Sequence, residues 1–538
     1  MTGYYQRLAD RPWLACVAVF VFVVAVRGAL LPWQHVPMPA VHDEFSYLLA
    51  GDTFAHGRLS NPPHPFWQHF ETFHILQQPT YASKYQPMQG LVLAFGEKFF
   101  GEPWIGVLLS TALMCAAICW MLQGWISPSL ALAGALLAAL RVGILSYWMN
   151  SYWGGSVPAI GGALVLGALA RIVFRKQHGH AATLAAGLGV LICSRPYDGL
   201  VLGMLTAFVL AWRLFRKQKL ELSAVIKRVA LPAVPALAIA AAFQLYYDYR
   251  VTGNALDLPY QAYERQYTVA PMLAWQPVRP APVYRHAVMR KLYTGWNVEL
   301  ANQVKADLAG SFLLKISALN EFFFGLYPLL VAPLIWPFPL KSEQEELTVW
   351  LLLGFLVALV PIAGFQPHYA AAITGLIYLR FLQAIARLDK WSVAGRRLGW
   401  ALAVFFMVLI PLQFVRDVWV LGKGGEYAPR LALNRQRVER TLEQQSGRHL
   451  VLVRYTPDHY IHEEWVYNGA DIDQQPIVWA REMGPDEDKP LINYFRGRQI
   501  WLLQADASPP RLTRYSESTQ AMPPPGRSAD IQTAGGSN

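Results

Sequence analysis

The sequence has few charged residues for its length and very few cysteines. Only 15% of its 538 residues are charged, against about 25% in soluble globular proteins, while 54% are hydrophobic. This scarcity of charge excludes a disordered chain and a string of soluble domains. All four cysteines fall inside apolar runs, so we expect small buried side chains rather than a disulfide framework or a ligand cluster: Cys16, Cys115, Cys119 and Cys193.

Several motifs of soluble enzymes are also missing. The sequence contains no Walker-type glycine-rich loop, no catalytic Ser-His-Asp spacing and no HExxH zinc motif, so no nucleotide cofactor is expected. The net charge of +11, from 46 basic and 35 acidic residues, raises the question of nucleic acid. In so apolar a chain, however, the basic residues are expected to set membrane orientation instead, and no nucleic-acid partner is predicted.

Long charge-poor runs of about 20 residues recur along the chain and predict a polytopic membrane protein. The run 181–212 is too long for one span and is broken by a turn sequence at 194–199, so it predicts two short spans joined by a hairpin. With these two, about eleven spans are expected. The other nine lie at roughly 12–31, 103–123, 128–147, 156–174, 229–247, 316–338, 347–364, 368–386 and 398–416.

Basic residues cluster in the short connections between alternate spans. The positive-inside rule makes those connections cytoplasmic and places the N-terminus inside and the C-terminus outside. The outer segments are then a first loop at 32–102, the hairpin tip at 194–199, a second loop at 248–315, and everything after 416. Residues 86–100 are apolar, but a crossing there would invert every later loop, so we predict a half-inserted helix on the outer face.

The composition changes after the last predicted span. Alternating runs at 449–455 and 499–503 predict strands, and 430–445 has a helical pattern, so 417–507 is expected to form a small extracytoplasmic α/β domain. Residues 508–538 are rich in Pro, Gly and Ser and are expected to form a disordered tail. The predicted fold class is thus an all-α polytopic module at 1–416 followed by this domain.

The first outer loop begins with an acidic pair, Asp43 and Glu44. Apolar residues that follow at 45, 48 and 49 predict a helix lying on the membrane surface, with both carboxylates in its first turn. One interpretation is a capped interfacial helix. The other is a catalytic base, because a partly desolvated carboxylate has a pKa closer to neutral pH.

Two basic residues are candidates for holding an anion at headgroup level. Lys84 precedes the predicted half-inserted helix and is expected either to bind a phosphate or to snorkel to phospholipid headgroups. Arg195 lies at the predicted hairpin tip, where it either pairs with Asp198 or faces a shared site as a phosphate ligand. His368, at the start of a late span, is either structural or a contact to the acceptor.

The order of these features resembles the GT-C superfamily of integral-membrane glycosyltransferases, which use polyprenyl-phosphate sugars. The resemblance is to the protein O-mannosyltransferase and aminoarabinose lipid A transferase type and to the bacterial RgtA/B/C/D-like enzymes, and it covers most of residues 1–415. A first span is followed by an acidic pair, a Lys-x-x-Pro segment and a short apolar helix. The stretches that carry it are His42-Asp43-Glu44-Phe45-Ser46-Tyr47, Lys84-Tyr85-Gln86-Pro87, Phe99-Phe100-Gly101 and Pro367-His368-Tyr369-Ala370-Ala371.

The resemblance implies roles for individual residues. Asp43 would be the base or the carboxylate that orients the acceptor, with Glu44 as the second choice, and Lys84 would hold the donor phosphate. Two family features are absent: Ser46 or Tyr47 replaces the arginine that often follows the acidic pair, and the stretch 149–156 lacks an expected second acid. In that stretch Asn150 is a candidate for hydrogen bonding a sugar, and His42 and His368 are further candidates for contact with the sugar or acceptor.

The expected function is therefore a glycosyltransferase at the outer face of a bacterial inner membrane. It would move a sugar from a polyprenyl-phosphate donor to a lipid, glycan or protein acceptor, with positive charge on the leaving phosphate. Participation of a divalent metal ion is left open. The alternatives are a transporter or flippase of lipid-linked sugars, which should show repeated halves and mid-membrane charges, and a non-enzymatic envelope assembly protein.

Overall fold

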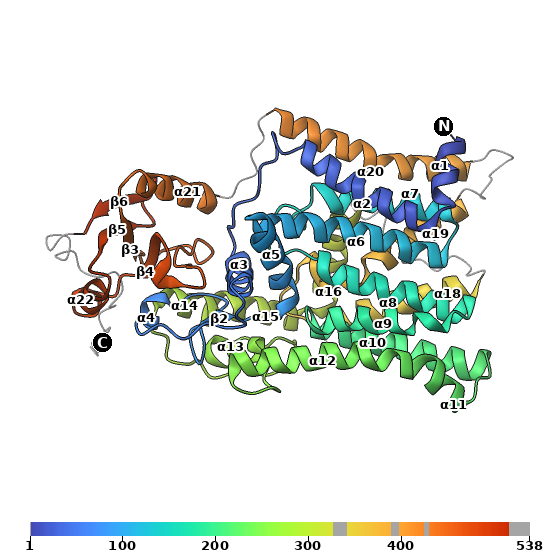
Figure 1. The fold of residues 1–538 in the computed structure, drawn as a ribbon, viewed down its shortest axis with the longest axis horizontal. Helices are drawn as coiled ribbons and strands as arrows, with labels where there is room; N and C mark the ends of the chain where they lie inside the picture. Colours follow the sequence, from blue (N-terminus) through green and yellow to red (C-terminus); the bar gives the residue numbers. More distant parts are fainter. Residues whose placement is uncertain (1, 326–341, 389–397, 424–429, 516–538) are drawn as a thin grey trace, which may run out of the picture.

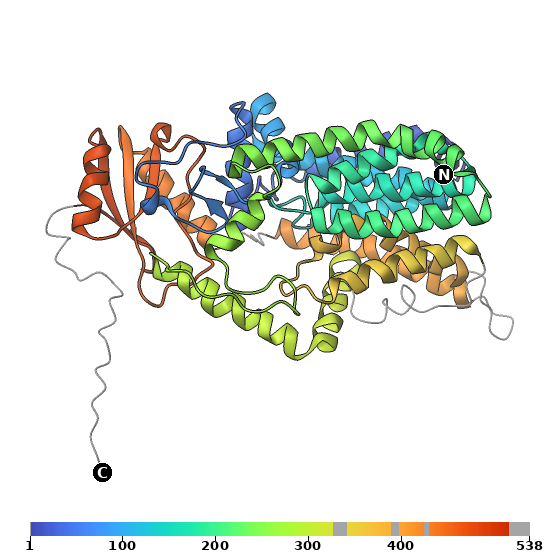
Figure 2. The same ribbon diagram turned by 90° about the horizontal axis from the view of Figure 1, so that it is seen from below.

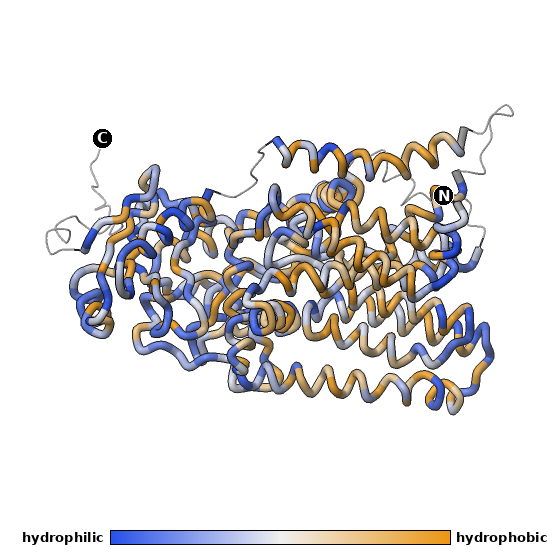
Figure 3. Tube along the Cα trace, turned by 45° about the horizontal axis from the view of Figure 1, so that its top comes forward, coloured by the Kyte–Doolittle hydropathy of each residue, from blue (hydrophilic) through white to orange (hydrophobic). Residues whose placement is uncertain are grey.

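The computed structural model describes residues 2–325, 342–388, 398–423 and 430–515. A bundle of long helices occupies one end of the molecule and a small sheet with two helices occupies the other (Figures 1 and 2). The first outer loop lies between them. Hydrophobic residues predominate along the bundle helices, and hydrophilic residues gather in the C-terminal part (Figure 3).

Seven helical segments in the described residues are long and apolar enough to cross a membrane. This supports a membrane protein, while the total of eleven spans and the side of each loop stay predictions. The break expected in the run 181–212 is present, because α9 ends at Ile192 and α10 begins at Pro196. The seven segments are Pro12–Ala29, Pro103–Trp125, Ser156–Arg175, Pro196–Lys217, Leu222–Thr252, Pro367–Arg387 and Trp400–Gly422.

The remaining bundle helices are shorter, and one predicted span is described only in part. The predicted span 316–338 begins within α16 (Leu308–Phe324), but its residues 326–338 lie outside the described residues. The last bundle helix, α20, runs from Leu398 to Gly422, six residues beyond the predicted boundary at 416. The other elements are α1 (Thr2–Ala9), α7 (Pro128–Ala138), α9 (Ala181–Ile192), α11 (Leu222–Val225), α12 (Leu231–Thr252), α18 (Glu343–Leu359) and α19 (Thr374–Leu388).

Small residues allow the central helices to pack closely. A Cβ atom added to Gly162 on α8 (Ser156–Arg175) would lie 1.7 Å from the carbonyl oxygen of Ala372, and one added to Gly187 on α9 would lie 2.6 Å from that of Gly161. Any side chain at these positions would push the helices apart. Close backbone approach of this kind is the usual basis of helix packing in a membrane, where burial of apolar surface supplies little driving force.

The first outer loop forms two helices that pack against each other. The α3 helix (His42–Ala55) begins at the acidic pair as predicted, and α5 (Pro87–Phe100) follows a short hairpin of β1 (Ile75–Leu76) and β2 (Ala82–Ser83). Phe45 and Leu49 of α3 are buried among residues of the C-terminal domain. The apolar face of α3 is therefore covered by protein, which corrects the expectation that this helix rests on the membrane surface.

The C-terminal domain is a four-stranded mixed sheet with strand order β4-β3-β5-β6. Strand β3 (Arg448–Arg454) pairs in parallel with β4 (Ile477–Arg481) and β5 (Arg498–Gln504), and β6 (Arg511–Arg514) is antiparallel to β5. The helices α21 (Arg430–Glu443) and α22 (Pro485–Tyr494) accompany it. Strand β6 falls inside the tail predicted to start at 508, so that boundary was placed too early; residues 516–538 lie outside the described residues.

Polar contacts attach the C-terminal domain to the first outer loop. The Tyr81 hydroxyl donates to the carbonyl oxygen of Asn468 (3.0 Å), and the backbone N–H of Ala470 donates to the Asp52 carboxylate (2.6 Å). His64 contacts Asp473 at 3.1 Å. The domain is therefore seated directly on the loop that carries the predicted catalytic residues.

Candidate active site at one end of the bundle

Three residues predicted from the sequence are brought near one another at the end of the bundle that faces the C-terminal domain. Asp43 lies in the first turn of α3, Lys84 directly follows β2, and Arg195 precedes the first residue of α10. The positive charges of Lys84 and Arg195 both act on the Asp43 carboxyl group. The site is thus assembled from three separate parts of the chain.

Asp43 takes part in a short chain of hydrogen bonds. The Tyr85 hydroxyl donates to the Asp43 carboxylate, and the same hydroxyl oxygen lies 3.1 Å from Nδ1 of His74. Since the Tyr85 proton is used on Asp43, His74 must donate its Nδ1 proton to Tyr85. Burial, together with the charge of Lys84, lowers the pKa of His74 well below its usual range, so the ring is neutral. Tyr85 and His74 therefore hold Asp43 in one orientation.

The environment of Asp43 raises the pKa of its carboxyl group and leaves the group accessible. Burial raises the pKa of its carboxyl group above the usual value, while the Tyr85 hydrogen bond and the charge of Lys84 lower it in part. The Asp43 side chain is nevertheless 25% exposed to solvent, so an acceptor group can reach it. A raised pKa and retained access are the properties expected of a general base.

His74 has a backbone conformation that is unusual for a non-glycine residue. Its φ angle is +61°, in the left-handed region, which is costly for an L residue with a large side chain. Three contacts hold it there. The His74 N–H donates to the Tyr263 hydroxyl oxygen (2.7 Å), and its carbonyl oxygen accepts from the Ser46 hydroxyl (2.6 Å) and from the Lys84 N–H (3.2 Å).

Lys84 lies in a partly aromatic enclosure. Its ammonium group sits 4.6 Å from the ring centre of Tyr260 and 4.9 Å from that of Tyr263, and it is 3.4 Å from a carboxylate oxygen of Glu264. Only 6% of the side chain is exposed. Lys84 is therefore not a snorkelling side chain: it is held inside the protein by α13 (Pro259–Tyr267) of the second outer loop.

Arg195 uses only part of its hydrogen-bonding capacity. Its Nε–H donates to Asp198 (2.5 Å), and its guanidinium group lies 4.4 Å from the ring centre of Tyr369. Within the described parts of the chain, the two terminal nitrogens have no hydrogen-bond partner. The predicted pairing of Arg195 with Asp198 is therefore present, and the guanidinium group keeps a planar pair of N–H donors that the pairing does not use.

Glu44 has a different surrounding from Asp43, although the two are adjacent. Its carboxylate accepts hydrogen bonds from the backbone N–H groups of Ala40 (2.8 Å), Val41 (3.1 Å) and Tyr152 (3.1 Å), and only 4% of the residue is exposed. Burial raises its pKa to about 7. These contacts tie the start of α3 to the loop after the π-helix η1 (Ala139–Ile144), so the geometry favours a structural role for Glu44 over the catalytic one.

Two of the candidate sugar or acceptor contacts are engaged elsewhere. The Asn150 side chain accepts from Arg27 Nε (3.1 Å) and donates to the carbonyl oxygens of Ile144 (3.1 Å) and Ser146 (3.0 Å). His368 Nδ1 lies 2.9 Å from the Tyr147 hydroxyl, and its ring is 4.9 Å from that of Trp153. Both residues therefore fit structural roles.

His42 remains close to the site. Its Nδ1 lies 2.9 Å from the Tyr467 hydroxyl of the C-terminal domain, and its Nε2 is buried with no hydrogen-bond partner in the described residues. The ring centres of His74 and His462 each lie 5.7 Å from the ring centre of His42. Burial lowers the pKa of His42 to about 3, so the ring is neutral.

Several residues of the site were not selected from the sequence. Tyr85 and Tyr369 stand beside selected residues within the motifs given above, whereas Tyr260, on α13, belongs to none of these motifs. His74 and Glu264 carried no recognisable signal, since their position depends on loop conformation.

A separate group at the other end of α3, formed by Asp52, His56 and Glu97, places three metal-ligating atoms within 4.8 Å of one another.

The similarity of this chain to known proteins is one of fold, to solved structures of low sequence identity. No protein-family model matches the sequence, and no curated protein matches it either. Solved structures do resemble the fold, and three of them follow.

Two similar structures are of the Archaeoglobus fulgidus oligosaccharyltransferase. The one solved with zinc and sulfate shares 14% identity and a TM-score of 0.43, over 81% of this chain and 60% of that one. The one solved with an inhibitory peptide and a dolichol-phosphate shares 11% identity and a TM-score of 0.38, over 81% of this chain and 62% of that one. The present chain thus spans less than two thirds of the length of these relatives.

The third similar structure is ArnT from Cupriavidus metallidurans, in the apo state. It shares 13% identity and a TM-score of 0.44, over 90% of this chain and 92% of that one. At these identities the similarity is one of fold. The activity of the present chain has to be argued from its own residues.

Proposed function

We propose that the protein is a membrane glycosyltransferase that moves a sugar from a polyprenyl-phosphate donor to a hydroxyl or amine acceptor. The observation that carries the proposal is the position of Asp43, a partly buried carboxyl group with retained access, within electrostatic range of Lys84 and Arg195. A base and two cations at one place match the two needs of glycosyl transfer from a phosphate, which are activation of the acceptor and stabilisation of the leaving group.

Lys84 and Arg195 would hold the donor phosphate. Arg195 offers two terminal nitrogens on a guanidinium group already fixed by Asp198 and by stacking on Tyr369, and Lys84 offers an ammonium group fixed by its tyrosine neighbours. As the bond between the anomeric carbon and the phosphate oxygen breaks, negative charge grows on the phosphate. Cations held in a site of low dielectric stabilise that charge more strongly than they would in water.

Asp43 would remove the proton of the acceptor as the acceptor attacks the anomeric carbon. Tyr85, oriented by His74, keeps the carboxylate in place. The donor would be a lipid because Lys84 and Arg195 precede the apolar helices α5 and α10, and the sequence offers no glycine-rich loop for a nucleotide. We place the site at the outer face of a bacterial inner membrane, in agreement with the distribution of basic loops.

The test is transfer by the purified protein in proteoliposomes that contain a radiolabelled pool of polyprenyl-phosphate sugars. We expect Asp43→Asn to lower the transfer rate by about 100-fold or more, the usual contribution of a general base. Lys84→Ala should also lower the transfer rate, because the donor phosphate would lose one of its two cations. Asp257→Asn and Lys305→Ala, which change outer residues remote from Asp43 in sequence, serve as charge-matched controls. Full activity of both Asp43→Asn and Lys84→Ala would refute the assignment.

A further inference from the structure

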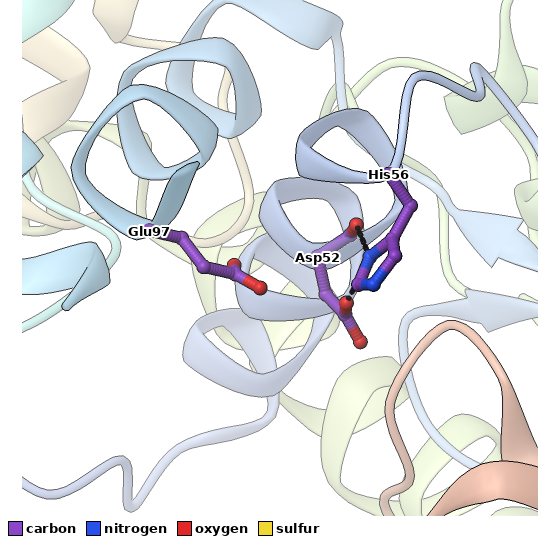
Figure 4. A group of neighbouring side chains, drawn as sticks. All are labelled: Asp52, His56 and Glu97. Atoms are coloured by element: carbon purple, nitrogen blue, oxygen red, sulfur yellow. Dashed lines mark hydrogen bonds and ion pairs between the residues drawn. The ribbon is translucent and has the colours of Figure 1, made fainter. Parts of the chain in front are cut away.

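The end of α3 that lies farthest from Asp43 carries a second cluster of chemically reactive side chains. Asp52 is on the last turns of α3, His56 directly follows that helix, and Glu97 is on α5; Figure 4 shows the three side chains gathered at one place. Asp52 is nine residues from Asp43, which corresponds to about 13 Å along a helix axis. The cluster is therefore separate from the candidate active site.

The geometry of the cluster is suited to a metal ion. One ligand atom from each residue lies within 4.8 Å of the other two, and Nδ1 of His56 is 2.9 Å from both Oδ1 and the backbone oxygen of Asp52. A metal ion bound at Nδ1 would replace the hydrogen bond to the backbone oxygen. Ligands of a tetrahedral zinc ion at 2.0–2.1 Å lie roughly 3.3 Å apart, so small side-chain movements would complete the arrangement. The four-residue spacing of Asp52 and His56 puts both on one face of a helical turn, the usual way in which a helix supplies two metal ligands.

The glycines of α3 and α5 bring Glu97 to this position. A Cβ atom on Gly51 would lie 2.9 Å from Cβ of Leu93, and one on Gly90 would lie 2.7 Å from Cβ of Ala50. The two helices can approach this closely only because neither position carries a side chain. Glu97 is two turns beyond Gly90 on α5, so the same close contact carries its carboxylate to Asp52.

Glu97 lacks a partner that would explain its position. In the described part of the chain, no hydrogen bond or ion pair reaches its carboxylate, although the group is half-buried. The Asp52 carboxylate is its neighbour in the cluster. A cation between Glu97 and Asp52 would hold the two carboxylates together, and the exposed imidazole of His56 leaves the position open to solution.

We propose that Asp52, His56 and Glu97 bind a divalent transition-metal ion, with Zn²⁺ as the best match. One imidazole and two carboxylates leave at least one coordination position for water, and an imidazole ligand favours zinc over magnesium or calcium. Asp52 would bind through Oδ1 while its Oδ2 accepts the N–H of Ala470 in the C-terminal domain. The metal would thus fix the carboxylate that attaches that domain to α3.

The hydrogen bond between Ala470 and Asp52 depends on the close approach of Gly469 to the Asp52 carboxylate. A Cβ atom at this position would lie 2.6 Å from Oδ2 of Asp52 and 2.5 Å from the Gln475 side chain. The loop before Ala470 can therefore reach Asp52 only with glycine there. This contact gives the proposed metal a readout besides catalysis, because binding should stabilise the whole chain against thermal unfolding.

The experiment uses the full chain in detergent, without a histidine tag and after treatment with a chelator. Equilibrium dialysis against zinc, with the metal content measured by mass spectrometry, should give one tight site per chain. His56→Ala and Glu97→Gln should each weaken it at least 10-fold, a size that loss of even a supporting group commonly produces. His180→Ala and Glu299→Gln are the matched controls and should bind as the original protein does.

Two outcomes would overturn the proposal. The first is equal zinc affinity in His56→Ala, Glu97→Gln and the unchanged protein, which would mean adventitious binding only. The second is equal affinity of the site for Mg²⁺ and Zn²⁺. Both variants change side chains outside the hydrophobic core, so we expect them to fold, and an unchanged unfolding midpoint without zinc checks this. The inference is independent of the proposed transferase activity, because metal binding is measured directly.

Discussion

Replacement of Arg195 by lysine separates charge from geometry at the proposed phosphate site. Arg195 commits Nε to Asp198 and keeps two terminal nitrogens for the donor. A lysine keeps the positive charge, but its single ammonium group would be drawn to Asp198, which is buried beside it. The phosphate would then lose at least one charge-assisted hydrogen bond. Such bonds contribute about 1.5–3 kcal/mol, so kcat/KM for the donor should fall roughly 10- to 150-fold.

The assay for this change is initial-rate transfer at varied donor concentration in proteoliposomes. Arg250→Lys is a matched control, because Arg250 is an exposed arginine that also contacts a tyrosine, Tyr246, and lies in the second outer loop. We expect the control to keep its kcat/KM. If Arg195→Lys also keeps its kcat/KM, Arg195 serves only to neutralise Asp198 and the phosphate assignment is refuted.

Three further predictions concern the same contacts. In Tyr85→Phe the hydrogen bond that lowers the pKa of Asp43 is lost, so the acid limb of the pH–rate profile, along which activity falls as Asp43 becomes protonated, should move to higher pH; an unmoved limb contradicts a base at Asp43. Glu44→Ala leaves three backbone N–H groups without an acceptor and should cost at least about 2 kcal/mol of stability, seen as a lower unfolding midpoint. Arg481→Met leaves the fully buried Glu464 unpaired and should cost about 3–5 kcal/mol, part of which Glu464→Gln should restore; additive losses would contradict this.

Much of the bundle could be predicted from the sequence because membrane spans are encoded locally. A run of apolar residues has to be helical to satisfy its backbone groups, and the hairpin break before Pro196 follows from the turn residues there. The strands at 448–454 and 498–504 also followed from local alternation. The misplaced boundary at 508 has the opposite cause, since β6 is a short strand that depends on pairing with β5 for its formation.

The site was less predictable because its geometry depends on distant segments. Asp43, Lys84 and Arg195 could be selected as charged residues near membrane ends, but Glu264 reaches Lys84 across 180 residues of chain. His74 depends on a left-handed backbone conformation that three remote contacts enforce, and no sequence pattern indicates such a conformation. For the same reason the hydrogen bonds of Glu44 and Asn150 could not be predicted, since their backbone partners are fixed only by the fold.

The central claim is that this chain forms a glycosidic bond with a sugar taken from a polyprenyl phosphate. The most direct measurement is the product balance of the purified protein in liposomes that contain a defined polyprenyl-phosphate sugar and a mixed pool of lipid, glycan and protein acceptors. We expect one free polyprenyl phosphate for each glycoside formed, with both products reduced together in Asp43→Asn. Movement of the intact lipid-linked sugar between leaflets, without any glycoside, would contradict it and would identify a transporter.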